Sequence, residues 1–486
     1  MKNSIAVLAV LAFLYLSAPT LAAPLAADLI LRHVFIVDVE HSTLVADQAV
    51  VIRNATLVDV GADASLATKW HAPTSIDATG RYLIPGLWDM HVHFGGGPEL
   101  IEENKALMPL YIAYGITTVR DCSGDLPQEV LKWRGELVQR TLLGPQLFTS
   151  GAKLEGIHPV WKGTLEVGSQ GDVDAALSRL TRDRVDFVKI TDSTMDPKLF
   201  LYALTRVHGM GMRASGHIPL QLTVQQAIDA GISSIEHIDY AYQAGVKDEA
   251  SIAADFAAGR IDRAEAYRRI DAGFDLPTAR AAYMVLAQRG VAVTPTLNGS
   301  RITAWLDTDD HAHDAYLAYI GPKLRKTYDW RIGRANRATP AELTFRHQHF
   351  EHLAAILPLL QEAGVSIMAG TDAGFLNSFD YPGIGLHEEL SLFVKSGLTP
   401  PQALIAATRA GPAWFGLLDQ YGGIANGKVA DLVLLDGNPL ADIAATRAIR
   451  AVVLRGRLFD RPALDKLLKD TRDKVSGWNR EAALSH

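Results

Sequence analysis

The sequence contains one cysteine among its 486 residues, Cys122. An intramolecular disulfide is therefore excluded, and stability must come from a large buried core. Cys122 follows an apolar run and has no histidine beside it, which favours a buried structural thiol over a catalytic nucleophile. Basic runs and low-complexity tracts are also missing, and the formal net charge is −7. This composition gives no reason to expect nucleic acid or an anionic membrane surface as a partner.

Long hydrophobic runs are scarce, and the exception lies at the N-terminus. There Lys2 is followed by the apolar run IAVLAVLAFLYL and the small-residue segment SAPTLAAP. A charged start, an apolar stretch of ~7–15 residues and a small-residue exit are typical of a secretory signal peptide. We predict a signal peptide over 1–22, cleaved after Ala22, and a periplasmic or secreted bacterial protein. A membrane anchor, the alternative, would need ~20 apolar residues, so no membrane association is expected after cleavage.

Two β-rich segments flank a long middle segment. Residues 23–83 contain short runs rich in Val and Ile, separated by Asn, Asp and Gly turns, and residues 416–465 repeat this pattern. We expect both segments to form one small β-sandwich domain built from the two chain ends. Residues 466–486 are predicted to form a C-terminal helix or tail.

The middle segment, 84–415, alternates strand-like runs with longer stretches of helical spacing. Such a series of β-then-α units predicts an α/β fold, a TIM-like (β/α)8 barrel. A large insertion at about 247–286 is predicted to add helices between the sixth and seventh strands. Reactive groups of these barrels lie at the C-terminal ends of the strands. The eight candidate strands are 83–92, 116–121, 146–151, 186–191, 212–217, 233–238, 291–297 and 365–374.

Three pairs of histidines are separated by one residue: His91/His93, His311/His313 and His347/His349. The first pair ends a strand, where residues i and i+2 point to the same face, so both imidazoles can reach one metal ion. The third pair lies in a stretch of helical spacing, where residues i and i+2 diverge. The second pair lies in a charged region with no strand before it. We therefore predict that only the first pair binds metal.

Four further polar residues come at the ends of candidate strands: Lys189, His217, His237 and Asp372. A buried histidine is usually a hydrogen-bonded core residue, but a lysine in an apolar strand is rarer, because burying an ammonium group is costly. Burial lowers the pKa of a lysine and makes its neutral amine available for chemistry. Such an amine can take up carbon dioxide and form a carbamate, an anionic oxygen ligand able to bridge two metals.

These segments carry a resemblance to a known family. PGLWDMHVHF, FVKI, SGH, IEH and GTDAG occur in this order, followed by the tail GLTPPQALIAATRAGPAWFGLLDQYGGIANGKVADLVLLDGNPL. The sequence resembles the metal-dependent amidohydrolase superfamily, within it the imidazolonepropionase-like and Xaa-Pro dipeptidase group, and is similar to its ochratoxin-hydrolysing members. The resemblance covers nearly all of the chain after the predicted signal peptide.

The resemblance implies roles for the strand-end residues. His91 and His93 would bind one metal, and His217 and His237 a second. Lys189, as N6-carboxylysine, would bridge the two metals. Asp372 would bind the first metal and serve as the catalytic general acid and base.

Two substrate-binding residues are implied as well, His158 and Tyr240. His158 corresponds to a substrate-side histidine that the group often shows in a Gly-Gly-His motif, where this chain has Gly-Ile-His. Tyr240 follows His237 by three residues and is expected to contact substrate. Packing within a loop is the alternative for both.

A mixed set of imidazole, carboxylate and carbamate ligands suits zinc, and the resemblance implies two Zn²⁺ ions per subunit. We expect an exported binuclear amidohydrolase in which a metal-bridging hydroxide attacks the amide of a dipeptide or of an N-acyl or aryl-acyl amino acid. The partner would be a small-molecule amide, and the resemblance suggests a homo-oligomer. Two alternatives stay open: opening of a cyclic amide, lactone or other ester on the same scaffold, and a non-catalytic binding protein.

Overall fold

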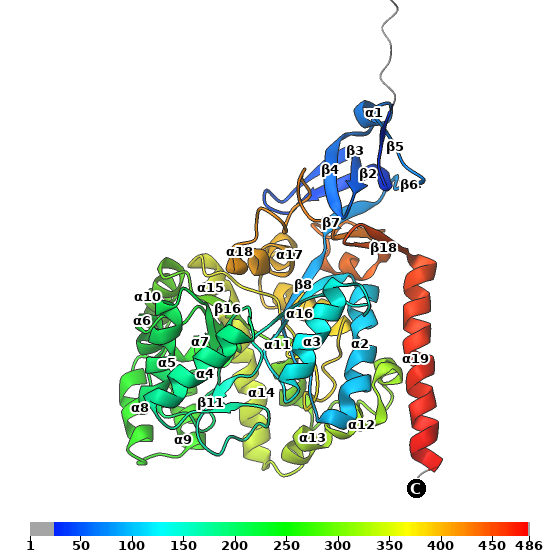
Figure 1. Ribbon diagram of the computed structural model, residues 1–486. Coiled ribbons are helices and arrows are strands. Elements are labelled where there is room, and N and C mark those ends of the chain that lie inside the picture. Colours follow the sequence, from blue (N-terminus) through cyan, green and yellow to red (C-terminus); the bar gives the residue numbers. More distant parts are fainter. Residues whose placement is uncertain (1–23, 485–486) are drawn as a thin grey trace, which may run out of the picture.

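The computed structural model describes residues 24–484. The predicted signal peptide, 1–22, lies outside these residues. A β-rich domain lies against one end of a larger α/β domain, and the C-terminal helix runs along the side of the larger domain (Figure 1). None of the helices described has the length and apolar character needed to cross a membrane.

The larger domain contains two parallel sheets. One has the order β10-β9-β8 and the other the order β12-β11-β13-β14-β15-β16. The strands are β8 (Leu87–Val92), β9 (Ile116–Asp121), β10 (Gln146–Thr149), β11 (Leu154–Glu155), β12 (Leu165–Glu166), β13 (Val188–Ile190), β14 (Ala214–Gly216), β15 (Ser234–Glu236) and β16 (Ala292–Thr294). β10 and β11 together occupy the third strand position, since β10 pairs with β9 and β11 pairs with β13.

The two sheets join into a closed ring. Parallel bridges link Ile367 to Val293 of β16 and Ala373 to Val92 of β8. The segment that carries them, residues 365–374, is the predicted eighth strand, and we call it the closing segment. On the other side, the Asp186 N–H donates to the carbonyl of Thr149 at 2.9 Å and joins β10 to the approach of β13. The predicted (β/α)8 architecture is therefore confirmed.

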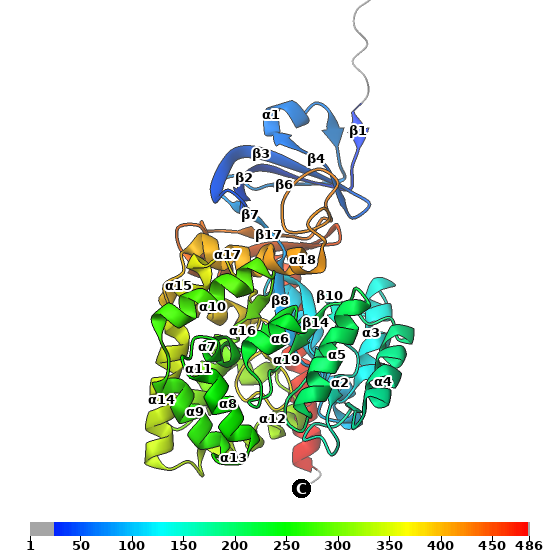
Figure 2. The same cartoon turned by 90° about the vertical axis from the view of Figure 1, so that its left-hand side faces the viewer.

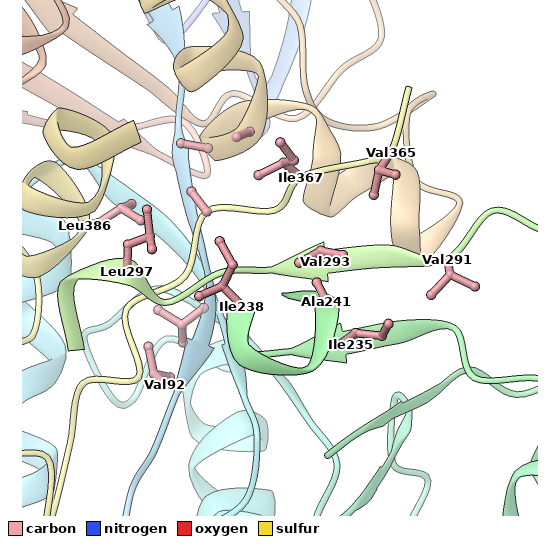
Figure 3. Close-up of a cluster of buried hydrophobic side chains, with 14 of the residues drawn as sticks. Val92, Ile235, Ile238, Ala241, Val291, Val293, Leu297, Val365, Ile367 and Leu386 are labelled. Carbon is pink, nitrogen blue, oxygen red and sulfur yellow. The ribbon is translucent and has the colours of Figure 1, made fainter. Parts of the chain in front are cut away.

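The side chains of the ring alternate between two environments. Glu236 and Thr294 are buried polar residues, whereas their strand neighbours Ile235 and Val293 are buried apolar residues. Figure 3 shows the latter two among Val92 and Ile367, next to Leu386 of a surrounding helix. Such strands are covered on both faces, which explains why they read as nearly continuous apolar runs.

Helices surround the ring (Figure 2). α4 illustrates the cause: its Val173, Ala176, Leu177 and Leu180 form one buried stripe, and Ser169 caps its N-terminus. The helices up to β16 are α2 (Ile101–Ala113), α3 (Pro127–Val138), α4 (Gln170–Arg182), α5 (Pro197–Gly209), α6 (Val224–Asp229), α7 (Ile238–Gln243), α8 (Glu249–Ala257), α9 (Arg263–Ala272) and α10 (Leu276–Gln288), with the 3₁₀ turn η1 (Pro98–Leu100) before α2. α8 and α9 confirm the helices predicted for the insertion.

A further group of helices follows β16. It includes α13 and α14, which matter for the site below. The group consists of α11 (Leu297–Trp305), η2 (Ala315–Tyr319), α12 (Pro322–Lys326), α13 (Asp329–Ala335), α14 (Pro340–Ala355), α15 (Leu357–Glu362), α16 (Ile384–Lys395), α17 (Pro400–Thr408) and α18 (Ala410–Phe415).

The smaller domain is built from both ends of the chain. Its sheet has the order β19-β18-β17-β7-β2-β3-β4, with β6 also pairing β2. Leu29 and Val50 from the first segment share a buried cluster with Leu432 and Val453 from the last. The elements are β2 (Leu29–Asp38), β3 (Thr43–Arg53), β4 (Thr56–Ala62), α1 (Asp63–Leu66), β6 (Thr74–Asp77), β7 (Tyr82–Pro85), β17 (Leu432–Leu435), η3 (Ile443–Arg447), β18 (Ile449–Leu454) and β19 (Arg457–Asp460), with β1 (Leu25–Ala26) paired to β5 (Trp70–His71).

The chain ends in a long helix, α19 (Arg461–Leu484), so the predicted C-terminal helix starts at 461 rather than at 466. Its Leu464 belongs to the main buried cluster of the larger domain. β7 pairs with β17 and leads almost directly into β8, so this crossing of the chain between the two domains is short.

Candidate active site

The predicted metal ligands come together at the C-terminal end of the ring. Each stands at or just beyond the end of its strand, as the barrel rule requires. They are His91 in β8, His93 just after β8, Lys189 in β13, His217 after β14, His237 after β15 and Asp372 in the closing segment.

His91, His93 and Asp372 lie close enough together to form a first candidate ligand set, called the first ligand set below. The Oδ1 atom of Asp372 lies 2.9 Å from Nε2 of His93 and 3.5 Å from Nε2 of His91. Nε2 of His91 is buried and has no hydrogen-bond partner among the described residues. A buried imidazole nitrogen that faces a carboxylate without a partner fits a metal ligand, because such an atom otherwise costs free energy.

Lys189, His217 and His237 form a second ligand set. Nζ of Lys189 lies 3.2 Å from Nε2 of His217, which lies 3.0 Å from Nε2 of His237. The rings of His237 and His91 have centroids 5.0 Å apart, so the two sets adjoin. Nitrogen and oxygen donors in this arrangement fit divalent metals.

Burial and charge tune these groups toward metal binding. Burial lowers the pKa of His91, His217 and His237, and the nearby Lys189 ammonium adds to this effect, which favours the neutral imidazole that binds metal. Burial also lowers the pKa of Lys189. For Asp372 burial acts in the opposite direction, but the hydrogen bond from His93 and the surrounding histidines outweigh it and hold the pKa well below the usual range.

Three ligand imidazoles are held through their second nitrogen. Nδ1–H of His91 donates to Oε2 of Glu236 at 2.6 Å, and Nδ1–H of His93 donates to the carbonyl of Ser123. Nδ1 of His237 hydrogen-bonds the hydroxyl of Thr296 at 2.8 Å. Such bonds fix the ring orientation and leave Nε2 facing the site.

Glu236 belongs to a buried network that the sequence analysis missed. Nη2 of Arg120 donates to both carboxylate oxygens of Glu236, at 2.8 and 2.7 Å, and the Ser215 hydroxyl donates to Oε1 at 2.7 Å. Burial would raise the pKa of Glu236, but Arg120 and His91 lower it well below its usual value. The sequence held a signal: Arg120 lies one residue before the end of a predicted strand, and Glu236 directly precedes a predicted ligand.

The closing segment packs closely against the end of β8. A Cβ on Gly374, where φ is +143°, would lie 2.2 Å from the carbonyl oxygen of His93. Asp372 and His237 have φ values of 71° and 70°, in a region that non-glycine residues rarely adopt. Unusual backbone at two predicted ligands is consistent with a functional site that the surrounding structure holds in place.

Two cavities open from the ligands, and both are lined by His237, Arg331 and Asp372. The smaller, of about 110 Å³, also includes Lys153 and Trp161. The larger, of about 410 Å³, lies under α13 and α14. The predicted centre therefore stands at the junction of two spaces.

Several cavity residues were not predicted. Burial lowers the pKa of Lys153 to about 8, and its ammonium lies 5.2 Å from the ring centre of Trp161. Arg331 follows β16 by many residues and is carried by α13, so no strand end marked it. Tyr267 reaches the larger cavity from α9 of the insertion.

The structure does not bring the two predicted substrate-binding residues into these cavities. His158 is exposed, and its N–H donates to Glu166 at 3.1 Å. The ring of Tyr240 stacks on His217 with centroids 5.6 Å apart. Tyr240 therefore contacts a predicted ligand, and neither residue is among those that line the two spaces.

The two histidines of each other pair have different surroundings, as predicted for the helical pair His347/His349. Nδ1 of His311 hydrogen-bonds Asp314, whereas His313 is exposed. His347 stacks on Trp305, whereas His349 hydrogen-bonds Asp271. Cys122 is buried, and burial raises its pKa to about 12, which agrees with an unreactive thiol.

A model of the amidohydrolase family matches residues 82–459. The chain belongs to the amidohydrolase family. Ochratoxinase from Aspergillus niger is 23% identical over an aligned length of 485 residues. The match covers 87% of this chain and 85% of that protein. Membership makes the protein a hydrolase that acts on C–N bonds, and amidohydrolases generally use divalent metals.

Two solved amidohydrolase structures are similar in fold. Bottromycin amidohydrolase has a TM-score of 0.71 at 21% identity, covering 92% of this chain and 90% of that one. A Xaa-Pro dipeptidase with bound methionine in the active site has a TM-score of 0.64 at 19% identity, covering 89% and 99%. The family and the barrel that the sequence analysis expected are thus confirmed.

Proposed function

We propose that this amidohydrolase is an exported binuclear metalloenzyme that hydrolyses the amide bond of a dipeptide or of an N-acyl or aryl-acyl amino acid. One observation carries the proposal. The two ligand sets adjoin through His91 and His237, and the buried amine of Lys189 lies at hydrogen-bond distance from His217.

His91, His93 and Asp372 would hold one Zn²⁺, and His217 and His237 the other. Lys189, as N6-carboxylysine, would contribute oxygens to both. Bound metals of this kind lower the pKa of water and polarise a carbonyl oxygen. The low pKa of Asp372 supports its assignment as a metal ligand, because the ionised carboxylate is the form that binds a cation.

Asp372 is the residue we assign to proton transfer. It lines both cavities, so it faces an amide bond placed across their junction. Its carboxylate takes the proton of the attacking water and returns it to the leaving nitrogen. Each cavity then receives one half of the substrate. The activities named for the similar proteins, an ochratoxinase, a dipeptidase and a bottromycin amidohydrolase, support cleavage of an amide.

The test is a hydrolysis screen of purified protein of known metal content. The panel contains Xaa-Pro dipeptides, N-acyl amino acids, aryl amides such as ochratoxin, and lactones. We expect two metals per chain and turnover of at least one amide. In His91→Ala we expect the metal content and the turnover to be lost together. His313→Ala is the matched control, because His313 is exposed and outside the ligand sets. Turnover of lactones alone, or a metal-free protein, would contradict the proposal.

The carbamate has its own test. Protein loaded with metal in ¹³C-bicarbonate is expected to show one slowly exchanging carbamate carbon by NMR, absent in Lys189→Met. A spectrum identical for both proteins would overturn the bridging role of Lys189 while leaving the rest of the ligand set intact.

Export and assembly are parts of the same proposal. The N-terminal pattern supports cleavage after Ala22, so the N-terminus of the mature protein is expected at Ala23. Fractionation of a bacterial host and N-terminal sequencing measure this directly. We further propose a homo-oligomer, which light scattering of the mature protein would distinguish from a monomer.

A further inference from the structure

The mouth of the larger cavity carries two arginines that pair with no carboxylate of the described residues. The guanidinium of Arg334 lies 5.0 Å from the ring centre of Trp330, a contact that leaves its N–H donors free for an anion. Arg334 stands on α13 and Arg346 on α14, and both line the cavity that reaches down to Asp372. Among residues 24–484 neither guanidinium forms an ion pair or a hydrogen bond. Paired arginines are common elsewhere on this surface, for example Arg289 with Asp229 at 3.1 Å.

The charges nearest to Arg334 are cations, and Glu342, the acid nearest to Arg346 on its helix, is hydrogen-bonded to another residue. The pKa of Arg334 is lowered, first by burial and then by the charges of Arg331, Arg346 and Arg337, so the cations repel one another. Glu342 is one turn from Arg346, but its carboxylate accepts hydrogen bonds from the N–H and the hydroxyl of Thr339. A cluster of like charges costs stability unless an anion binds there.

The other charged groups of the cavity are already engaged. Arg331 donates to Thr303 at 3.1 Å, to the carbonyl of Leu376 at 3.1 Å and to Asn377, and it lies 3.7 Å from Asp372. Asp239, the second acid of the cavity, lies 3.6 Å from Nε2 of His349. Arg334 and Arg346 are thus the charges left for a ligand.

The wall between the predicted centre and the mouth is apolar. It includes Phe345, Phe350 and Leu353, with Tyr267 from the insertion. A ligand that fills this cavity would place carbon chain or ring against the wall and negative charge at the mouth. An apolar wall that leads to a cationic mouth favours a substrate with a carbon-rich part and a negative charge over an uncharged aliphatic amide.

We propose that Arg334 and Arg346 bind an anionic group of the substrate remote from the scissile bond, and that the preferred substrates are amides of acidic amino acids, which carry two carboxylates. This inference rests on the proposed amide hydrolysis and adds the substrate class. Two guanidinium groups suit carboxylates, because each offers a planar fork of donors.

The test compares substrates that differ only in charge. N-benzoyl-glutamate and N-benzoyl-glutamine share their shape and their α-carboxylate, so their ratio of kcat/KM isolates the side-chain charge. We expect a preference for glutamate that falls about tenfold in Arg334→Gln and in Arg346→Gln, since a hydrogen bond to a charged group contributes enough for that factor. Arg289→Gln is the matched control and should keep the preference. Equal rates for the two substrates, or a preference unchanged in both variants, would overturn the inference.

A binding measurement separates this inference from the proposed function. Titration of the metal-loaded protein with glutarate by calorimetry is expected to give binding that weakens about tenfold in each variant and with rising salt. The neutral glutaramide should bind far more weakly. If no amide is hydrolysed, the proposed function fails, and glutarate binding still decides the anion site. Glutarate binding that is equal in wild type and both variants would exclude the anion site even in an active enzyme.

Discussion

Asp372 belongs to the first ligand set and lines both cavities. Asparagine has the same shape and an oxygen that can still face a metal, but it cannot take up a proton. We expect Asp372→Asn to keep its metal content and to lower kcat by about 10²–10⁴, the usual contribution of a general acid and base. Metal analysis and steady-state kinetics measure both. The exposed Asp419→Asn is the control, and a fully active Asp372→Asn protein would exclude the proposed role.

Arg120 is a buried charge whose loss should cost considerable stability. It is fully buried and its charge is balanced by Glu236, which also holds His91. Arg120→Met leaves that carboxylate buried without its partner, so the free energy of unfolding should fall by about 3–5 kcal/mol. Urea unfolding followed by tryptophan fluorescence measures the change.

The control for that prediction is the exposed pair of Arg289 and Asp229. Arg289→Met should change the free energy of unfolding by about 0–1 kcal/mol, because water screens an exposed pair. Equal losses in the two variants would show that the buried network contributes no more than a surface ion pair.

At the scale of single residues, the sequence predicted the polar residues that lie at strand ends. His91 and His93 were recognisable because alternation on a strand puts them on one face. Arg120 and Glu236 were not recognised, because their positions near strand ends do not show that the two side chains pair with each other across the barrel. Arg334 and Arg346 lie on helices whose approach to the site depends on tertiary packing, which no spacing rule encodes.

The insertion helix α9 turns one face toward the site. Arg263, Tyr267 and Asp271 are four residues apart and therefore lie on the same side of the helix. Nη1 of Arg263 lies 4.0 Å from Asp192, whose other oxygen is 3.5 Å from Nδ1 of His217. Asp271 accepts a hydrogen bond from His349 at 2.8 Å. One added helix thus supports a predicted ligand, a cavity wall and a cavity histidine.

This arrangement predicts a pH-dependent effect of Asp271→Asn. Burial tends to lower the pKa of His349, but Asp239 and Asp271 outweigh it and raise that pKa above its ordinary value. The stability that the ion pair contributes is present below the unfolded pKa of about 6.5 and is lost as pH rises through the folded value. The variant should therefore be destabilised more at pH 6 than at pH 9 in urea unfolding. A difference from wild type that does not change with pH would contradict the ion pair.

The close approach of the closing segment gives a second prediction for an element. Gly374→Ala would put a methyl group against the backbone of His93, so β8 and the closing segment must separate. We expect reduced metal content in a protein that still folds. Gly364→Ala is the matched control, because its φ is also positive, at +81°, but nothing lies within 4 Å of its Cβ. Equal metal content in the two variants would show that backbone strain alone acts there.

Element order and type followed from the sequence because buried parallel strands read as apolar runs and surface helices show a period near 3.6. Boundaries were less certain, as the start of α19 at Arg461 shows. The loop that carries His158 lies outside the lining of both cavities, a placement that a motif match does not specify.

At the scale of the whole molecule, α19 fastens the two domains to each other. It follows β19 of the small domain directly, and its Leu464 is fully buried in the core of the large one. Leu464→Ala should lower the free energy of unfolding by about 2–5 kcal/mol, because it opens a cavity in a packed core. Thermal unfolding followed by circular dichroism measures this.

Leu484 of the same helix supplies the control, since it is 88% exposed. Leu484→Ala should leave the midpoint of unfolding nearly unchanged. If Leu464→Ala unfolds like the wild type, the packing of α19 against the large domain contributes nothing to the free energy of unfolding.

The segment that completes the ring also carries the last-made donor, Asp372, and places it against His91, which is made at the beginning of the barrel. The imidazoles of the two candidate ligand sets are therefore synthesised well before the carboxylate of Asp372. If these sets hold metal as proposed, the first set is complete only after the last segment of the ring has packed against β8, so metal content would report closure of the barrel.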